Sequence, residues 1–177
     1  MIWESQYWKG PLLAIAKRLR RFKSTQRLTD RSLVQIERDV FLGFYSVRKL
    51  FDTHKITDAT KARSVLITCH PNTRPVNWRN SHQIDRCYDL TTSRHDSRTI
   101  RFICNMFIHS FVFAPIVGEH GGLDGLFFTS DREKDRKLFS IDIDAVIEIF
   151  ERVGGDYPSS MEWRRDPETG AETMKIS

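Results

Sequence analysis

RFICNMFIHSFVF, residues 101–113, is nearly all apolar, and three of its polar side chains recur at intervals of four residues. They are Arg101, Asn105 and His109. In a helix these three side chains lie on one slowly drifting stripe, each about one turn beyond the last. The stretch is long for a strand, and apolar residues cover the other helical faces, so it predicts a buried helix.

Two amphipathic helices are predicted before this stretch. Residues 8–23, WKGPLLAIAKRLRRFK, carry apolar side chains at helical spacing on one side and cations on the other. The second helix follows a capping residue, Thr29 or Asp30, and its apolar side chains recur at steps of three and four from Leu33 to Phe51. Gly43 lies inside this second helix, where we expect it to permit close contact with another helix.

The segments between the second helix and the apolar stretch are expected to combine short helical, extended and loop structure. SVLITC, residues 64–69, has the β-branched composition of a strand and follows an expected helical turn at residues 57–63. Residues 82–90 are expected to form a second short extended piece. TTSRHDSR, residues 91–98, is expected to be a polar loop.

Strand patterns replace helical ones after the apolar stretch. FVFAPIVGE, LFFTSD and LFSIDI alternate with glycine-rich and charged turns, which predicts a three-stranded antiparallel meander over residues 111–143. A closing helix is expected before Gly154, followed by a polar hairpin or tail around PETG. We therefore expect a single α+β domain, with residues 1–110 mainly helical, residues 111–153 forming the meander and closing helix, and residues 154–177 polar.

The two halves of the chain carry opposite charge. Residues 1–101 hold 20 Lys and Arg against 9 Asp and Glu, whereas residues 102–177 hold 8 against 14. A basic front half predicts a partner that carries phosphates, such as RNA or another polyanion. The alternative is a solvated basic surface that binds no such partner.

Two basic segments are the candidate nucleic-acid contacts. One is the cationic side of the first predicted helix, and the other is the loop NTRPVNWRNSH, residues 72–82. In the loop, Trp78 can stack on a base while neighbouring arginines bind phosphates, or it can anchor the loop to the domain. The candidate residues are Lys17, Arg20, Arg21, Arg74, Trp78 and Arg79.

The stripe of arginine, asparagine and histidine suits phosphate chemistry. A neutral imidazole can remove a proton from a ribose 2′-hydroxyl, and a guanidinium can bind the non-bridging phosphate oxygens. An asparagine can position either the imidazole or the phosphate. The stretch, preceded by the helix IERDVFLGFYSVRKLF, also resembles the HEPN superfamily of helical ribonucleases over about residues 30–112.

The HEPN resemblance implies a metal-independent endoribonuclease or a toxin-type bacterial defence factor that acts on RNA. It makes His109 the base, Arg101 the phosphate-binding residue and Asn105 an auxiliary polar residue. Attack by the 2′-hydroxyl would leave a 2′,3′-cyclic phosphate. The resemblance also implies a homodimer and an antitoxin or defence partner protein. The interval from Arg101 to His109 is longer than is usual in the family, and Phe102 stands where a polar residue is usual.

Two other classes of function are compatible with the sequence. In one, the protein is a non-catalytic nucleic-acid-binding or adaptor module with a basic helical face, and His109 is a satisfied structural residue. In the other, it interacts through the edge of the Phe-rich meander and needs no nucleic acid. Salt-dependent RNA binding separates the second class from the first.

The cysteines indicate a reducing location. Cys69, Cys87 and Cys104 form no disulfide framework, so a cytoplasmic protein is expected. The N-terminus does not resemble a signal peptide, and no apolar run reaches the roughly 20 residues of a membrane span. Cys69 and Cys87, taken with His70 and His82, lack the paired spacing of a zinc site, so neither metal nor cofactor is expected.

Overall fold

The computed structural model describes residues 2–167 and 169–177 of an α+β protein, which confirms the predicted fold class. The helices are α1 (Gln6–Lys23), α2 (Asp30–Phe51), α3 (Asp58–Lys61), α4 (Ile84–Cys87), α5 (Ile100–Ile108) and α6 (Ile143–Gly155). The strands are β1 (Ser64–Pro71), β2 (Arg94–Thr99), β3 (Ser110–Val117), β4 (Leu123–Ser130), β5 (Lys137–Asp142), β6 (Met161–Arg165) and β7 (Glu172–Ile176). None of the described helices has the length and apolar composition that crossing a bilayer requires.

Strands from both halves of the chain share one antiparallel sheet. In the described part of the chain, the sheet has the order β2-β1-β5-β4-β3, and β6 pairs with β7 in a separate hairpin. The predicted meander is confirmed, since β4 pairs with both β3 and β5. β1 pairs with β5 on one side and with β2 on the other, so the front half of the chain extends the sheet.

Two predictions for the segment before α5 are wrong. Residues 91–98 are not simply a polar loop, because β2 begins at Arg94. Residues 82–90 are not extended throughout, because α4 forms one helical turn there. β2 is an edge strand whose side chains are polar on both faces, so no apolar alternation in the sequence marks it as a strand.

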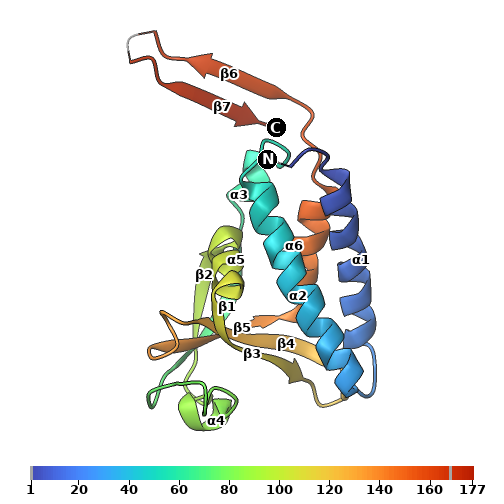
Figure 1. Cartoon of the computed structure of the whole chain (residues 1–177), viewed down its shortest axis with the longest axis vertical. Helices are drawn as coiled ribbons and strands as arrows, with labels where there is room; N and C mark the ends of the chain where they lie inside the picture. The colour runs from blue at the N-terminus through green and yellow to red at the C-terminus, as the bar shows by residue number, and fades with distance from the viewer. Residues whose placement is uncertain (1, 168) are drawn as a thin grey trace.

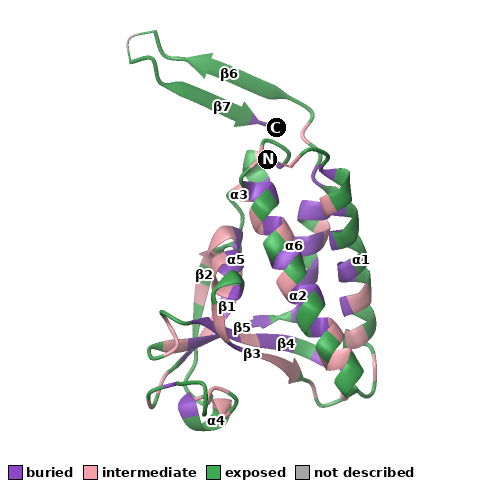
Figure 2. Ribbon diagram, viewed as in Figure 1, coloured by how far each residue is buried: buried purple, intermediate pink, exposed green. Residues whose placement is uncertain are grey.

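The helices α1, α2, α5 and α6 share one apolar core with the sheet (Figures 1 and 2). At its centre, the ring of Phe107 in α5 stacks at 4.2 Å on Phe44 of α2 and at 4.4 Å on Phe128 of β4. Gly43 permits a close contact between α2 and α6, as predicted, because a Cβ atom there would lie 2.4 Å from Cζ of Phe150. This core fixes the position of α5 between α2 and the sheet.

The apolar stretch forms both a helix and the beginning of a strand. Thr99 caps α5, and its side-chain oxygen accepts a hydrogen bond from the backbone N–H of Phe102 at 3.3 Å. The helix ends at Ile108, and β3 starts at Ser110. The predicted helix is therefore confirmed over most of the stretch. Its last part, from Ser110 onward, belongs to the sheet.

The polar hairpin predicted around PETG is also confirmed. β6 and β7 extend away from the body of the molecule, and most of their residues are exposed (Figures 1 and 2). Ile176 of β7 is buried, and its backbone N–H donates to Oδ2 of Asp58 in α3 at 2.9 Å. This contact lies at the base of the hairpin, so the body of the molecule holds the hairpin at one end.

Candidate functional site

The predicted polar stripe lies at the surface of the molecule. Arg101 and Asn105 are half-buried on α5, and His109 is an exposed residue immediately after the helix. Arg101 contacts the end of α2: its Nη1 lies 3.0 Å from Oδ1 of Asp52, and its Nη2 donates to the carbonyl oxygen of Phe51 at 3.3 Å. The prediction of a buried helix therefore applies to one face of α5, and the stripe occupies its accessible side.

Arg48 of α2 reaches the stripe from the neighbouring helix. Its Nε donates to Oδ1 of Asn105 at 3.1 Å, and its Nη1 forms an ion pair with Asp52. The hydrogen bond from Arg48, followed by the one from Arg101, holds the pKa of the Asp52 carboxyl below its ordinary range. Asp52 is therefore ionised at neutral pH and keeps both guanidinium groups in place.

Asn105 and His109 line a surface hollow of about 570 Å³. We name it the His109 hollow. Its lining residues are Arg48, Asn105, Met106, His109, Ser130, Asp131 and Arg132. Arg101 is not among these residues. The structure thus brings two members of the stripe together, and the guanidinium groups in the hollow come from α2 and from the turn after β4.

Backbone contacts fix the position of His109. Its N–H donates to the carbonyl oxygen of Asn105 at 3.1 Å, and its carbonyl oxygen accepts from the N–H of Asp131 at 3.2 Å. Within the described part of the chain, its imidazole makes no hydrogen bond or ion pair. Both ring nitrogens are therefore available to a ligand in the hollow.

Ser130 also lines the hollow, but its hydroxyl is buried. The residue is only 2% exposed, and its Oγ has no hydrogen-bond partner in the described structure. A buried hydroxyl without a partner costs free energy, which an internal water molecule can recover. Ser130 ends β4, and its position next to Asp131 places it beside the backbone contact that holds His109.

The geometry of the hollow suits an anionic ligand with an exchangeable proton. The two ring nitrogens of the His109 imidazole provide a hydrogen-bond donor and an acceptor. Arg48 uses Nε and Nη1 within the protein, and its Nη2 has no partner among the described residues. Because Oδ1 of Asn105 accepts from Arg48, the amide nitrogen of Asn105 can donate to an oxygen of a ligand. Asp131 also lines the hollow, and its carboxylate lies 3.0 Å from Nζ of Lys134.

The predicted binding residues of α1 differ in their contacts. Arg20 is paired with Glu151 of α6 at 2.7 Å, so its charge is already neutralised. Lys17 and Arg21 are exposed and make no ion pair within the described part of the chain. Other cations of α1 also have acidic partners, since Arg18 pairs with Asp39 at 2.7 Å and Lys23 pairs with Asp144. Much of the basic face of α1 therefore binds neighbouring helices.

The predicted binding loop presents its tryptophan to solvent. Trp78 is 76% exposed, and the guanidinium of Arg79 lies 4.9 Å from its ring centroid. Arg74 instead turns inward and donates to Oε1 of Gln83 at 3.0 Å. The loop places Trp78 and Arg79 where they can contact a ligand, and it does not use Trp78 as an anchor.

The comparisons with known proteins leave the family of this chain undetermined. No protein-family model, no curated protein and no solved structure matches it. The HEPN resemblance, and the roles that it implies, therefore stay predictions.

The sequence reasoning missed several residues of the hollow, namely Arg48, Ser130, Asp131 and Arg132. Arg48 had one available signal, because it stands four residues before Asp52 on a predicted helix, a spacing typical of an ion pair. Ser130, Asp131 and Arg132 lie at and after the end of β4, and no local pattern predicts that this turn reaches α5.

Proposed function

We propose that the protein is a metal-independent endoribonuclease, HEPN-like in its chemistry, that cleaves RNA at the His109 hollow. One observation carries the proposal: the accessible imidazole of His109 shares a hollow with the guanidinium groups of Arg48 and Arg132. Such a combination provides a proton acceptor and cations for the phosphate in one place. A toxin-type role in bacterial defence is the cellular function that this activity would serve.

In the proposed reaction, His109 accepts the proton of a ribose 2′-hydroxyl. The 2′-oxygen then forms a bond to the adjacent phosphorus while the bond from phosphorus to the 5′-oxygen breaks. The leaving 5′-oxygen takes a proton from the imidazolium, so the imidazole returns to its neutral form. The products are a 2′,3′-cyclic phosphate and a 5′-hydroxyl end.

The other residues of the hollow have supporting roles in this proposal. Arg48 and Arg132 bind the non-bridging oxygens, on which negative charge accumulates as the 2′-oxygen attacks. The amide nitrogen of Asn105 donates to the same phosphate group. Arg101, the residue first predicted to bind phosphate, acts through Asp52 as a positioning residue for Arg48.

The test is cleavage of an end-labelled mixed-sequence RNA in EDTA by wild type and a folded His109→Gln variant. We expect His109→Gln to cleave about 100-fold more slowly or worse, which is the scale of a lost general base. His120→Gln is the matched control, because His120 is also exposed but does not line the hollow. A single 2′-deoxynucleotide in the substrate should prevent cleavage at that position, because the attacking 2′-hydroxyl is missing there.

A second candidate function is non-catalytic RNA binding, which the exposed Trp78 and its neighbour Arg79 favour. Base stacking on an exposed aromatic ring needs no catalytic group. Salt-dependent RNA binding without cleavage by any variant, in a folded sample, would support this second function and contradict the first. Equal cleavage by wild type and His109→Gln would place the nuclease activity outside the hollow.

A further inference from the structure

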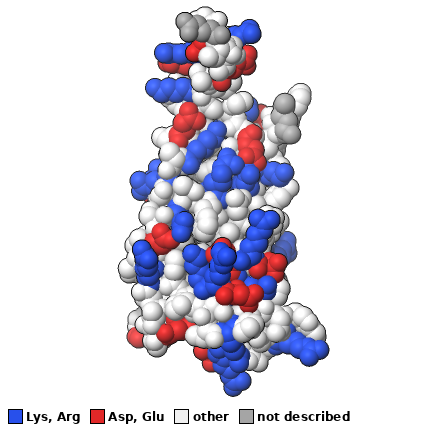
Figure 3. All heavy atoms as spheres, turned by 90° about the vertical axis from the view of Figure 1, so that its left-hand side faces the viewer, with Lys and Arg blue, Asp and Glu red and all other residues white. Residues whose placement is uncertain are grey.

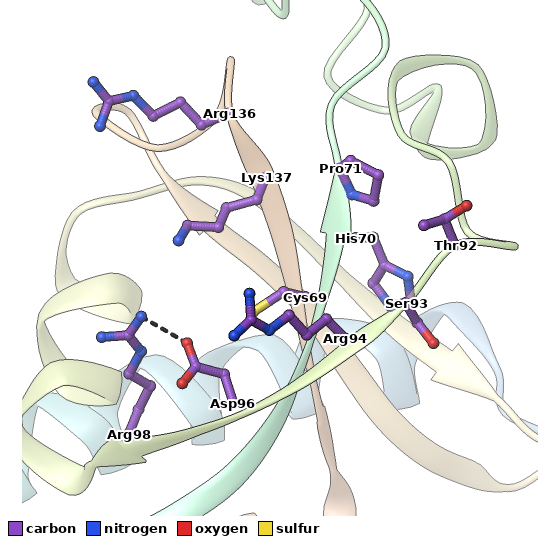
Figure 4. Close-up of a pocket in the computed structure, with 10 residues that line it drawn as sticks. All are labelled: Cys69, His70, Pro71, Thr92, Ser93, Arg94, Asp96, Arg98, Arg136 and Lys137. Atoms are coloured by element: carbon purple, nitrogen blue, oxygen red, sulfur yellow. Dashed lines mark ion pairs between the residues drawn. The ribbon is translucent and has the colours of Figure 1, made fainter.

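A second hollow, of about 550 Å³, lies at the other side of the β4–β5 turn, where β1, β2 and β5 meet (Figure 4). We name it the cationic pocket. Its charged lining residues are Arg94, Asp96, Arg98, Arg136 and Lys137. No local sequence pattern predicts the pocket, because two of its arginines lie on β2, whose polar residues are typical of a loop.

The register of the sheet explains why these side chains converge. Arg94, Asp96 and Arg98 alternate along β2, so they point to the same face of the sheet. Cys69 of β1 pairs with Arg94 on one side and with Phe139 of β5 on the other, so its thiol points to this face too. On β5, Lys137 lies two residues before Phe139, and its Nζ is 5.4 Å from the centroid of that ring.

The pocket has far more positive than negative charge. Four cations and one carboxylate line the pocket. The carboxylate belongs to Asp96, and it forms an ion pair with Arg98 at 2.6 Å (Figure 4). The side chain of Arg94 makes no ion pair or hydrogen bond within the described part of the chain. Arg136 and Lys137 lie 4.0 and 3.9 Å from Glu133, which is the outer limit of an ion pair.

Many cations elsewhere in the molecule are paired with carboxylates, so the excess of positive charge in the pocket is unusual for this protein. On α1, Arg18, Arg20 and Lys23 each have a carboxylate on a neighbouring helix. Figure 3 draws the side of the molecule that carries β2 and the β4–β5 turn, and over most of that surface basic side chains lie beside acidic ones. Placing several unneutralised cations around one concave surface costs electrostatic free energy unless an anion binds there.

The hydrogen bonds of Arg98 also indicate an anion-binding site. Its Nη2 binds Asp96, but its Nε is buried and has no partner in the described structure. The guanidinium stacks at 4.9 Å over Phe102 of α5, which fixes its plane. An oxygen of a bound anion can accept from a guanidinium held in this way.

We infer that the cationic pocket binds a phosphoryl group of a nucleotide or nucleic acid. A phosphoryl group has several oxygens that can accept from the arginines and from Lys137 at once, and its charge balances part of the excess. The inference goes beyond the proposed function, since binding here requires no cleavage. The ligand group is either a terminal phosphate or the diesters of a backbone.

Cys69 provides a probe inside the pocket. It is partly exposed, whereas Cys87 and Cys104 are fully buried, so iodoacetamide should modify Cys69 first. The rate is followed by mass spectrometry with increasing pyrophosphate, against sodium chloride of the same ionic strength. We expect pyrophosphate, and not chloride, to slow modification of Cys69 several-fold.

Two pairs of substitutions make the test specific to the pocket. Arg94→Gln with Arg136→Gln removes two exposed pocket cations and should raise the pyrophosphate concentration for half-protection at least about tenfold. Lys17→Gln with Arg21→Gln, the matched control, removes two exposed cations of α1 and should leave that concentration unchanged. Equal effects of the two pairs, or equal protection by chloride, would overturn the inference.

Oligodeoxynucleotides identify the source of the phosphoryl group without cleavage, because they lack the attacking 2′-hydroxyl. Protection of Cys69 by a 5′-phosphorylated but not by a 5′-hydroxyl oligonucleotide assigns the pocket to a terminal phosphate. Equal protection by both assigns it to backbone diesters. A failure of protection by pyrophosphate and by both oligonucleotides would reject phosphoryl binding and would leave the test of cleavage at His109 unaffected.

Discussion

Asp52 connects two arginines that the sequence gives no reason to associate. Its carboxylate forms one ion pair with Arg48, one turn earlier on α2, and another with Arg101 on α5. Only Arg48 also lines the His109 hollow, where its Nε donates to Asn105. A single carboxylate thus positions the guanidinium proposed to bind phosphate, and it does so from outside the hollow.

Asp52→Asn tests this arrangement through its pH dependence. The folded-state pKa of Asp52 lies below its ordinary value of 3.8, so the carboxylate stabilises the fold above that pH. The contribution is lost as the pH falls through the lower folded-state value. We expect Asp52→Asn to lose less than about 1 kcal/mol at neutral pH, because the side chain is half-exposed. In urea titrations, the difference from wild type should disappear at acid pH; a difference independent of pH would contradict the role of the charge.

Local sequence patterns predicted only part of the candidate site. Asn105 and His109 were expected together because side chains four residues apart in a helix are neighbours, and both line the hollow. Arg101 satisfied the same spacing, but an acidic partner on α2 draws its side chain toward Asp52. Arg48 could not be assigned to the hollow, because its contact with Asn105 depends on how α2 packs against α5.

The elements with clear apolar periods were the predictable ones. One face is buried in each of α2, α5, α6 and the meander that includes β4. In each of these elements the apolar residues therefore recur in the sequence with the period of the helix or strand. β2 buries little, since its residues are polar and it forms the edge of the sheet, so its identity depends on pairing with β1. The cationic pocket was missed for the same reason.

The contact between α2 and α6 predicts opposite effects for two glycine substitutions. A Cβ at Gly43 would lie 2.4 Å from Cζ and 2.7 Å from Cε2 of Phe150, a ring that is fully buried. Gly43→Ala should cost about 1–3 kcal/mol in overpacking, offset by about 0.5–1 kcal/mol of helix propensity.

Gly155→Ala is the matched control for this contact. Gly155 is the exposed last residue of α6, and a Cβ there would meet nothing within 4 Å outside its chain neighbours, so the substitution should stabilise the protein by up to about 0.5–1 kcal/mol. Urea midpoints measure both variants. If Gly43→Ala were as stable as Gly155→Ala, the close approach of the two helices would be wrong.

Across the whole molecule, the two hollows lie on either side of one well-fixed turn, residues 131–136. Asp131 and Arg132 line the His109 hollow, whereas Arg136 lines the cationic pocket. The turn is held by the segment before β2: Oδ1 of Asp135 accepts from the N–H of Val76 at 2.6 Å, and the hydroxyl of Tyr88 donates to the carbonyl oxygen of Lys134 at 2.8 Å. One single-stranded RNA that passes over this turn could therefore contact both hollows.

The salt dependence of RNA binding tests whether one strand uses both hollows. Each phosphate contact of a single strand contributes about −0.7 to the slope of log K against log salt concentration. In a His109→Gln background, which prevents cleavage, Arg94→Gln with Arg136→Gln should make the slope less negative by about 1.4. Lys17→Gln with Arg21→Gln should leave it unchanged, because α1 lies on the side of the molecule away from β2 (Figure 1). An equal change for both pairs would mean that RNA binds to the general positive charge of the protein, without a preferred path across the turn.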